Sequence, residues 1–354
     1  MLNYQKRKLT LINQDFHADA EFDVYEEQFN PLRTDRKARR KRKPKAKHEP
    51  KKSFGQIITE LADATVGLEG GFNITYQPSR YEEGWLLSSL RSFYDLGLIS
   101  DVMAVVKGGK EASVYRCKGE AITGQTWLAA KVYRPNQFRT LRNDSMYREG
   151  RAILDARGND HDHARDQRVA RAIGKKTAFG RQVAHTSWLM HEYTTMERLY
   201  QAGAAVPRPI AASDNAVLMS YHGDARLAAP TLNQVSLESY EAVSLFEEVL
   251  RNVELMLWHN LIHGDLSAYN ILYWEGELTV IDFPQVANIR ANSSAYAILQ
   301  RDIERICDYF VRQGVRCDAA AIVDELWQRY GEVDLHIRAA DESKRMPLLP
   351  DAAL

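Results

Sequence analysis

The chain has 354 residues, 45 % hydrophobic and 27 % charged, which is the balance of a folded protein with a sizeable core. The mean hydropathy of −0.43 and the lack of any run near the roughly 18 apolar residues of a transmembrane span exclude a helical membrane protein. The first residues lack the apolar stretch of a signal peptide. The three cysteines are too few and too scattered for a disulfide framework or a zinc site, so we expect a cytoplasmic protein with no membrane partner.

The net charge of zero, from 47 basic and 47 acidic residues, hides a strongly basic segment. Residues 33–52 carry twelve Lys or Arg and two acids, a local charge of +10, so the rest of the chain carries −10. Because the segment has no apolar period, we expect residues 1–53 to form a disordered arm, acidic before the basic stretch. Arg33–Lys52 is a candidate contact for ribosomal RNA or a ribosomal particle, and a tail that aids solubility is the alternative.

Regular structure is expected from residue 54. Residues 54–100 are predicted to form a small helical module, with helices near 57–66 and 81–96 and Gly97 ending the second. Strands follow over 101–106 and 127–133. The polar stretch 136–185 predicts a mobile loop with helical pieces, in which we assign no role to the histidines.

The second half of the chain shows helical and strand-like patterns in turn. Helical spacing covers 188–200, 237–259, about 295–313 and 318–330. Strand-like runs occupy 206–210 and 216–221. Two more flank Glu275 and Gly276, a pair typical of a hairpin turn.

The clearest chemical signal is the segment 262–272, Ile-His-Gly-Asp-Leu-Ser-Ala-Tyr-Asn-Ile-Leu. It places Asp265 five residues before Asn270, and Asp282 follows twelve residues later, after a strand-like run. Phosphoryl transfer needs a carboxylate that accepts the proton of the attacking hydroxyl and oxygen ligands that hold Mg²⁺ against the ATP phosphates. Asp265 suits the first task, and Asn270 and Asp282 suit the second. The joint spacing favours this reading over one in which these side chains only cap turns.

Further parts of a nucleotide site lie upstream. A glycine-rich turn between two strands could bring backbone N–H groups to phosphates, a weak signal by itself. Lys131 lies in an apolar strand and needs an anionic partner, for which phosphate and Glu192 are the candidates. Adenine would then dock through backbone groups on Leu218–His222, where the strand at 216–221 leads into a linker. The candidate nucleotide-binding residues are Gly108, Gly109, Lys110, Glu111, Ser113, Val114, Lys131, Glu192, Met219, Ser220 and His222.

These motifs together resemble the RIO family of atypical serine/threonine protein kinases. The resemblance runs from about Val102 to Gly314 and rests on Gly-Gly-Lys-Glu-Ala-Ser-Val-Tyr, Ala-Lys-Val-Tyr, Trp-x₃-Glu, His-Gly-Asp-Leu-Ser-x-Tyr-Asn and Ile-Asp-Phe-Pro-Gln. It implies an α+β, two-lobed protein-kinase-like fold with an N-terminal helical extension. The small β-rich lobe would span 101–222 and the helical lobe 223–344, with a tail at 345–354.

The resemblance also implies ATP with Mg²⁺ or Mn²⁺ in the cleft, and Lys131 paired with Glu192. Asp265, Lys131 and Asp282 would be catalytic, and Asn270 and Asp282 would hold the metal. Family members resemble autophosphorylating serine kinases, and some resemble ATPases that act in small-subunit ribosome maturation. In the ATPases the residue equivalent to Asp282 takes the phosphoryl group. ATP and a protein substrate, or the chain itself, are therefore the expected partners.

The chain departs from the family at Lys107-Gly108, where Ser-Thr is frequent, and two hydroxyls near the phosphates are lost. Pro284 replaces the glycine of Asp-Phe-Gly, and no Ala-Pro-Glu segment follows, so the usual activation loop is missing. Two other functions stay open. One is a small-molecule phosphotransferase of the aminoglycoside or choline kinase kind. The other is an RNA- or ribosome-binding module switched by nucleotide.

Overall fold

The computed structural model describes residues 72, 74–109, 111–134, 153–158, 171–175 and 177–331. Contacts divide the chain into units 1–64 and 65–354, and all described residues belong to the second. The arm, the predicted helix near 57–66, Lys110, most of the predicted loop and the tail lie outside the described residues.

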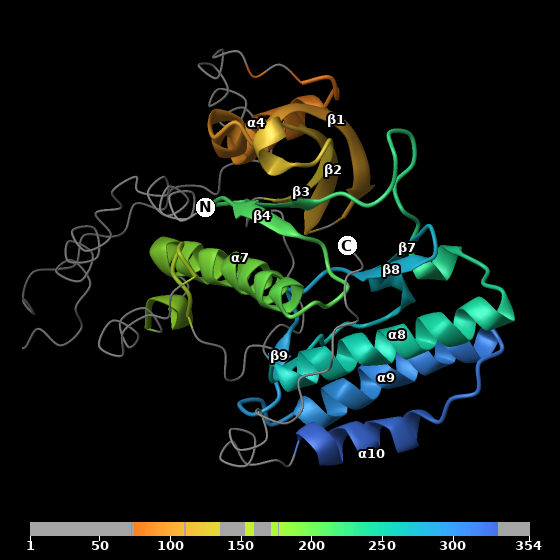
Figure 1. The fold of residues 1–354 in the computed structure, drawn as a ribbon. Helices are drawn as coiled ribbons and strands as arrows, with labels where there is room; N and C mark the ends of the chain where they lie inside the picture. Colours follow the sequence, from red (N-terminus) through yellow and green to blue (C-terminus); the bar gives the residue numbers. More distant parts are fainter. Residues whose placement is uncertain are drawn as a thin grey trace, which may run out of the picture. The chain divides into compact units, whose positions relative to one another are not determined.

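A five-stranded antiparallel sheet forms the first part of the described chain, in the order β1-β2-β3-β5-β4 (Figure 1). Its strands are β1 (Ile99–Gly108), β2 (Ala112–Gly119), β3 (Trp127–Tyr133), β4 (Pro209–Ala212) and β5 (Ala216–Ser220), with the 3₁₀ turn η2 (Ala121–Thr123) after β2.

Helix α4 (Arg80–Asp95) packs against this sheet and confirms the predicted helix at 81–96. Leu86, Leu90 and Phe93 repeat at helical spacing and are buried in one core with strand residues such as Val102 and Leu128. The helix ends at Gly97, whose φ of +63° is a backbone conformation that favours glycine.

Helix α7 (Ala178–Gln201) contacts β4 and β5, and its residues share a core with Tyr133 and Val217 of the sheet. The neighbours of those two residues along the strands, Val132 and Leu218, belong to the α4 core, so α4 and α7 use opposite faces of the sheet.

The predicted loop extends too far, because α7 begins at Ala178 rather than after residue 185. Thr177 caps the helix by accepting a hydrogen bond from the Gly180 N–H at 2.9 Å. The first two turns expose Arg181 and Gln182 and bury the polar His185, so no continuous apolar stripe marks the start of the helix.

Strand β4 also begins later than the run at 206–210 suggests. Pro207 and Pro209 have no N–H to give to a ladder, so pairing with β5 is confined to Pro209–Ala212.

Three helices form the second part of the fold, and they lie side by side in Figure 1: α8 (Ser239–Trp258), α9 (Ala295–Arg312) and α10 (Ala319–Tyr330). They agree with the helices predicted at 237–259, 295–313 and 318–330. The short elements that carry the site precede α9: η4 (Leu232–Gln234), β6 (Leu261–Ile262), η5 (Ala268–Asn270), β7 (Ile271–Trp274), β8 (Glu277–Val280) and β9 (Ala287–Asn288).

The β7–β8 hairpin confirms the predicted turn. Glu275 and Gly276 have φ values of +52° and +89°, the left-handed pair that a tight hairpin of this kind needs. No helix in the described ranges has both the length and the hydropathy that crossing a bilayer requires.

Candidate active site

Lys131 of β3 lies between two carboxylates from distant parts of the chain. Its Nζ is 2.5 Å from Glu192 Oε1, in the middle of α7, and 2.5 Å from Asp282 Oδ1, just after β8. The Lys131 and Glu192 side chains are buried, whereas the Asp282 side chain is 41 % exposed. The structure therefore brings together three residues that the sequence places up to 151 positions apart.

The charges of this trio depend on one another. Burial works against the charge of Lys131, but Asp282 and Glu192 raise its pKa above the ordinary lysine value. Burial raises the pKa of Glu192 and is opposed by Lys131. Burial also works to raise the pKa of Asp282, but Lys131 holds it below the usual range. Asp282 is thus the ionised and accessible carboxylate of the trio.

Asp282 has a strained backbone. Its φ of +75° lies in the left-handed region, which costs a residue with a Cβ about 1–2 kcal/mol. The preceding residue, Ile281, donates its N–H to the Asn270 carbonyl at 2.9 Å. This bond places the two predicted metal ligands, Asn270 and Asp282, on adjacent segments.

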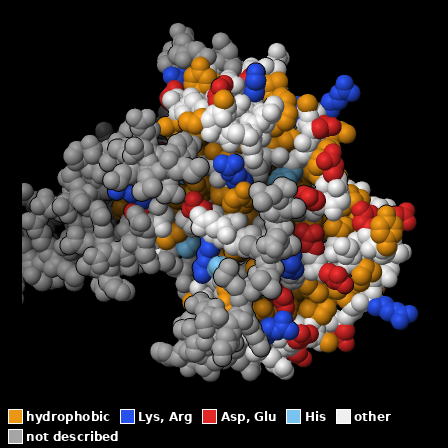
Figure 2. All heavy atoms as spheres, in the orientation of Figure 1, with side chains coloured by type: hydrophobic (Ala, Val, Ile, Leu, Met, Phe, Trp, Pro, Cys, Tyr) orange, Lys and Arg blue, Asp and Glu red, His pale blue; other side chains and the backbone are white. Residues whose placement is uncertain are grey.

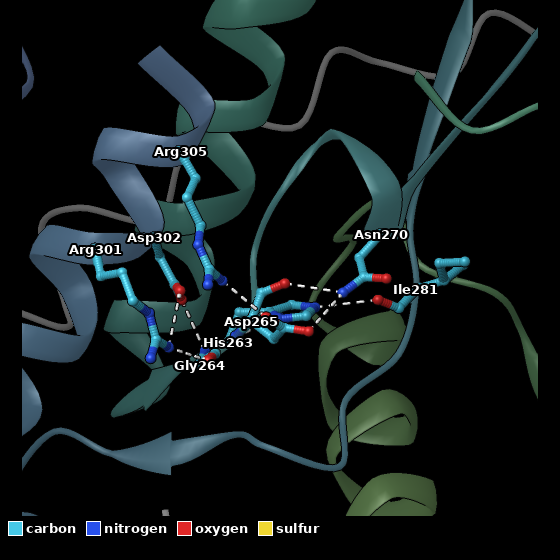
Figure 3. A network of polar contacts seen from close by, with 8 residues as sticks. All are labelled: His263, Gly264, Asp265, Asn270, Ile281, Arg301, Asp302 and Arg305. Atoms are coloured by element: carbon cyan, nitrogen blue, oxygen red, sulfur yellow. Dashed lines mark hydrogen bonds and ion pairs between the residues drawn. The ribbon is translucent and has the colours of Figure 1, made fainter. Parts of the chain in front are cut away.

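The loop between β6 and β7 carries Asp265 (Figure 3). Asn270 Nδ2 donates to the Asp265 carbonyl at 2.9 Å and to Asp265 Oδ2 at 3.2 Å. These bonds use the amide nitrogen and leave the Asn270 Oδ1 as the atom that can ligate a cation.

His263 holds the start of this loop. Burial lowers its pKa, which favours the neutral ring. In one tautomer Nε2–H donates to the Ile281 carbonyl at 3.1 Å, and Nδ1 accepts the Asp265 N–H at 3.3 Å. His263 thereby connects the Asp265 loop to the segment that carries Asp282.

Helix α9 holds the same loop through its polar residues (Figure 3). The Gly264 N–H donates to Asp302 Oδ2 at 2.7 Å, and Arg301 donates to the Gly264 carbonyl. One turn further, Arg305 Nη1 lies 2.8 Å from Asp265 Oδ1. Backbone and side chain of the loop are thus both bound by α9.

Sequence reasoning gave no role to His263, Arg301, Asp302 or Arg305. A signal was present for Asp302, which occupies a position in the buried stripe of α9 between Leu299 and Ile306. A carboxylate there needs polar partners, and Gly264 and Arg301 supply them.

The predicted phosphate loop lies between β1 and β2, and its Lys110 is outside the described residues. Gly108 pairs with Ser113 across the turn, and a Cβ at Gly109 would lie 2.6 Å from the Ala112 carbonyl oxygen. Val114 pairs with Lys131 in the β2–β3 register, so this turn leads directly to the lysine. The Glu111 carbonyl accepts a hydrogen bond from the backbone N–H that follows β3.

The predicted adenine-binding stretch lies at the end of β5, where Met219 and Ser220 pair with β3. Ser220 Oγ accepts the Arg208 N–H at 2.9 Å and lies 3.3 Å from His222 Nε2, and His222 Nδ1 lies 3.3 Å from Thr279 Oγ1. These side chains bind within the fold. A hollow of 440 Å³ borders this stretch, but neither Lys131 nor Asp282 lines it.

The donor set fits a hard divalent cation bound together with phosphates. Within the described ranges no group of three or more His, Cys, Asp or Glu forms a complete protein cage for a metal ion. Mg²⁺ commonly takes one or two protein oxygens and completes its shell with phosphate and water. Asp282 Oδ atoms and Asn270 Oδ1 are a matching pair.

Comparison with known proteins identifies the family. A family model of the RIO domain matches residues 158–322. The chain is 32 % identical over 231 residues to the RIO-type serine/threonine-protein kinase Rio1 of Haloferax volcanii, covering 64 % of this chain and 69 % of that protein. It is 29 % identical to the serine/threonine-protein kinase RIO1 of Chaetomium thermophilum, covering 62 % of this chain but 41 % of that longer protein.

A solved structure supports the fold. The Rio2 kinase of Chaetomium thermophilum, in an ADP/Mg²⁺-phosphoaspartate complex, superposes with a TM-score of 0.50 at 21 % identity. The match covers 81 % of this chain and 78 % of that one. The predicted α+β, two-lobed kinase-like fold is confirmed, and the chain belongs to the RIO family.

Proposed function

We propose that this chain is a RIO-type, ATP-dependent phosphotransferase that moves the γ-phosphoryl group of ATP to a serine or threonine hydroxyl. The observation that carries the proposal is the position of Lys131 Nζ, 2.5 Å from both Glu192 and Asp282. A buried lysine fixed by a helix glutamate next to a half-exposed aspartate is what binding of ATP phosphates and their cation needs. The names of the curated relatives support the same reaction.

Each residue then has one task. Lys131, held by Glu192, would bind phosphate oxygens, and Asp282 would be the carboxylate available to a cation. Asn270 and Asp282 hold Mg²⁺ or Mn²⁺, which neutralises phosphate charge when bound. Asp265 orients the acceptor hydroxyl and takes its proton.

The fate of the phosphoryl group has three alternatives: a hydroxyl, water, or Asp282 itself. The related Rio2 kinase of Chaetomium thermophilum was solved as a phosphoaspartate complex with ADP and Mg²⁺. Here Asp282 is the exposed carboxylate of the trio, so an acyl phosphate on Asp282 followed by hydrolysis would give ATPase activity. We place autophosphorylation, ATP hydrolysis and a role in ribosome maturation within this proposal.

The test is ATP turnover and protein phosphorylation by the wild type, Asp265→Asn and Asp282→Ala. We expect both variants to lose at least about 100-fold in turnover, since each removes a group used in the transition state. Asp214→Asn, in the exposed turn between β4 and β5, is the control and should keep full activity. Equal turnover in all four proteins would contradict the proposal.

A second function is favoured by the +10 charge of residues 33–52. We propose that this arm contacts ribosomal RNA in the cytoplasm while the RIO domain hydrolyses ATP. The family assignment favours these roles over the small-molecule phosphotransferase considered from the sequence.

A further inference from the structure

A polar hollow of 670 Å³ opens beside Asp265, on the side of the loop that faces α9. We call it the acceptor hollow. It is lined by the loop between β6 and β7 and by the exposed face of α9, and the residues used below are Asp265, Ser267, Tyr269, Arg305, Asp308 and Arg312. Tyr269, which lines the hollow, is 65 % exposed.

Both side-chain oxygens of Asp265 already have donors. Arg305 Nη1 lies 2.8 Å from Oδ1, and Asn270 Nδ2 lies 3.2 Å from Oδ2 (Figure 3). Each carboxylate oxygen can accept a second hydrogen bond, so a hydroxyl can approach either oxygen, and its approach is least hindered where the donor already present can move away. Asn270 is buried and also bonds the Asp265 carbonyl, whereas the Arg305 side chain is 42 % exposed. Half-exposed ion pairs contribute about 0–1 kcal/mol, so Arg305 is the donor that yields.

Once it leaves Asp265, Arg305 is available to bind another anion. Its planar guanidinium matches a carboxylate or phosphate with two parallel hydrogen bonds. Arg312 lies seven residues further on the same exposed face of α9, about 10 Å away along the helix, and lines the same hollow. The hollow thus offers two guanidinium groups to whatever approaches Asp265.

We propose that the acceptor hollow binds a peptide segment in which acidic or phosphorylated residues flank the acceptor serine or threonine. The anion next to the hydroxyl draws Arg305 away from Asp265 and frees Oδ1 for the hydroxyl proton. A second anion binds Arg312. Asp308 lies between the two arginines and repels negative charge there, which favours a peptide with separated anions over a continuous polyanion such as nucleic acid.

This inference rests on the proposed function, and its test separates the two. Three serine peptides of equal length, flanked by Asp/Glu, by Gln/Ala or by Lys, are offered with Mg²⁺ and labelled ATP. The wild type should phosphorylate the acidic peptide with a kcat/KM at least about tenfold above the neutral one, and the Lys peptide least.

Charge reversal identifies the surface. Arg312→Glu should remove the preference for the acidic peptide and improve use of the Lys peptide. The matched control is Arg316→Glu, four residues further and outside the lining of the hollow, and it should behave as the wild type.

The inference is overturned if the wild type turns over ATP but phosphorylates no peptide, shows no charge preference, or prefers the Lys peptide. It is also overturned if Arg312→Glu and Arg316→Glu respond alike. Failure of the proposed function looks different, because the wild type would then neither hydrolyse ATP nor phosphorylate itself or any peptide.

Discussion

The Asp282 carboxylate cannot bind Lys131 and a metal cation in the same orientation. In the structure its carboxylate binds Lys131, with Oδ1 2.5 Å from Nζ. In the proposed reaction the same carboxylate faces a cation. Because Glu192 stays with Lys131, the lysine keeps a buried anionic partner when Asp282 turns away. The half-exposed position and left-handed backbone of Asp282 fit a residue that changes partners.

Asp302 gives a prediction on pH. Burial raises its pKa to about 7, although the Gly264 N–H and Arg301 favour the charged form. The folded protein therefore keeps this proton up to about pH 7, whereas the unfolded chain releases it near pH 4. Since the unfolded state binds fewer protons between these values, Asp302 makes the free energy of unfolding fall as pH rises, by up to about 1.4 kcal/mol per pH unit.

The measurement is urea unfolding at several pH values between 4.5 and 7.5, on the wild type and Asp302→Asn. The asparagine keeps an oxygen for the Gly264 N–H but cannot ionise. We expect the difference in unfolding free energy between the two proteins to shift in favour of Asp302→Asn as pH rises. Parallel pH profiles would show that Asp302 ionises alike in both states.

At the scale of elements, the segment after β6 turns on Gly264. Its φ is +83°, and a Cβ there would lie 2.2 Å from the Gln285 carbonyl oxygen. Gly276 in the β7–β8 turn has a φ of +89° but open space around it. Alanine at Gly276 would therefore introduce backbone strain alone, whereas alanine at Gly264 would introduce both backbone strain and a steric clash.

Gly276→Ala should lower the free energy of unfolding by about 1–2 kcal/mol, the cost of a left-handed alanine. Gly264→Ala adds a clash with backbone and should cost at least about 2 kcal/mol more, together with most ATP turnover. Urea unfolding of both variants measures the difference. Equal losses would mean that the Gln285 segment moves freely aside.

The same elements show what sequence can predict. The helices after residue 237 each have one clear apolar face, and the β7–β8 hairpin has a typical turn pair. The predicted bounds of these elements are therefore close to those in the structure. The start of α7 was not predicted closely, because its first turns expose Arg181 and Gln182 and bury the polar His185. In the site, local spacing predicted roles for Asp265, Asn270 and Asp282, and the structure places Asn270 within hydrogen-bond distance of Asp265. The hold of α9 on Gly264 was missed, since nothing local to either segment indicates the other.

At the scale of the whole molecule, the basic arm differs from the rest of the chain in its net charge. On the face shown in Figure 2, Lys and Arg side chains of the described residues are scattered, with Asp and Glu between them. The concentrated positive charge of the chain is in the sequence 33–52, which lies outside the described residues.

Replacing the twelve Lys and Arg of residues 33–52 by Gln should therefore remove most affinity for single-stranded RNA and leave ATP binding unchanged. If about ten phosphates are engaged, log K of the wild type falls with log salt with a slope of about −7. Fluorescence anisotropy across a salt series measures this slope. An unchanged slope in the substituted protein would place RNA binding elsewhere.

The central claim is that Lys131, Glu192, Asp265, Asn270 and Asp282 surround one nucleotide and its cation. Isothermal titration calorimetry with a non-hydrolysable ATP analogue, with Mg²⁺ and with EDTA, tests it most directly. We expect one site per chain, tighter with Mg²⁺. The increase in affinity that Mg²⁺ gives should be lost in Asp282→Asn. Binding of the analogue should weaken in Lys131→Met, both with Mg²⁺ and with EDTA. A wild type that binds the analogue equally with and without Mg²⁺, or an Asp282→Asn protein that keeps the full gain, would contradict the account.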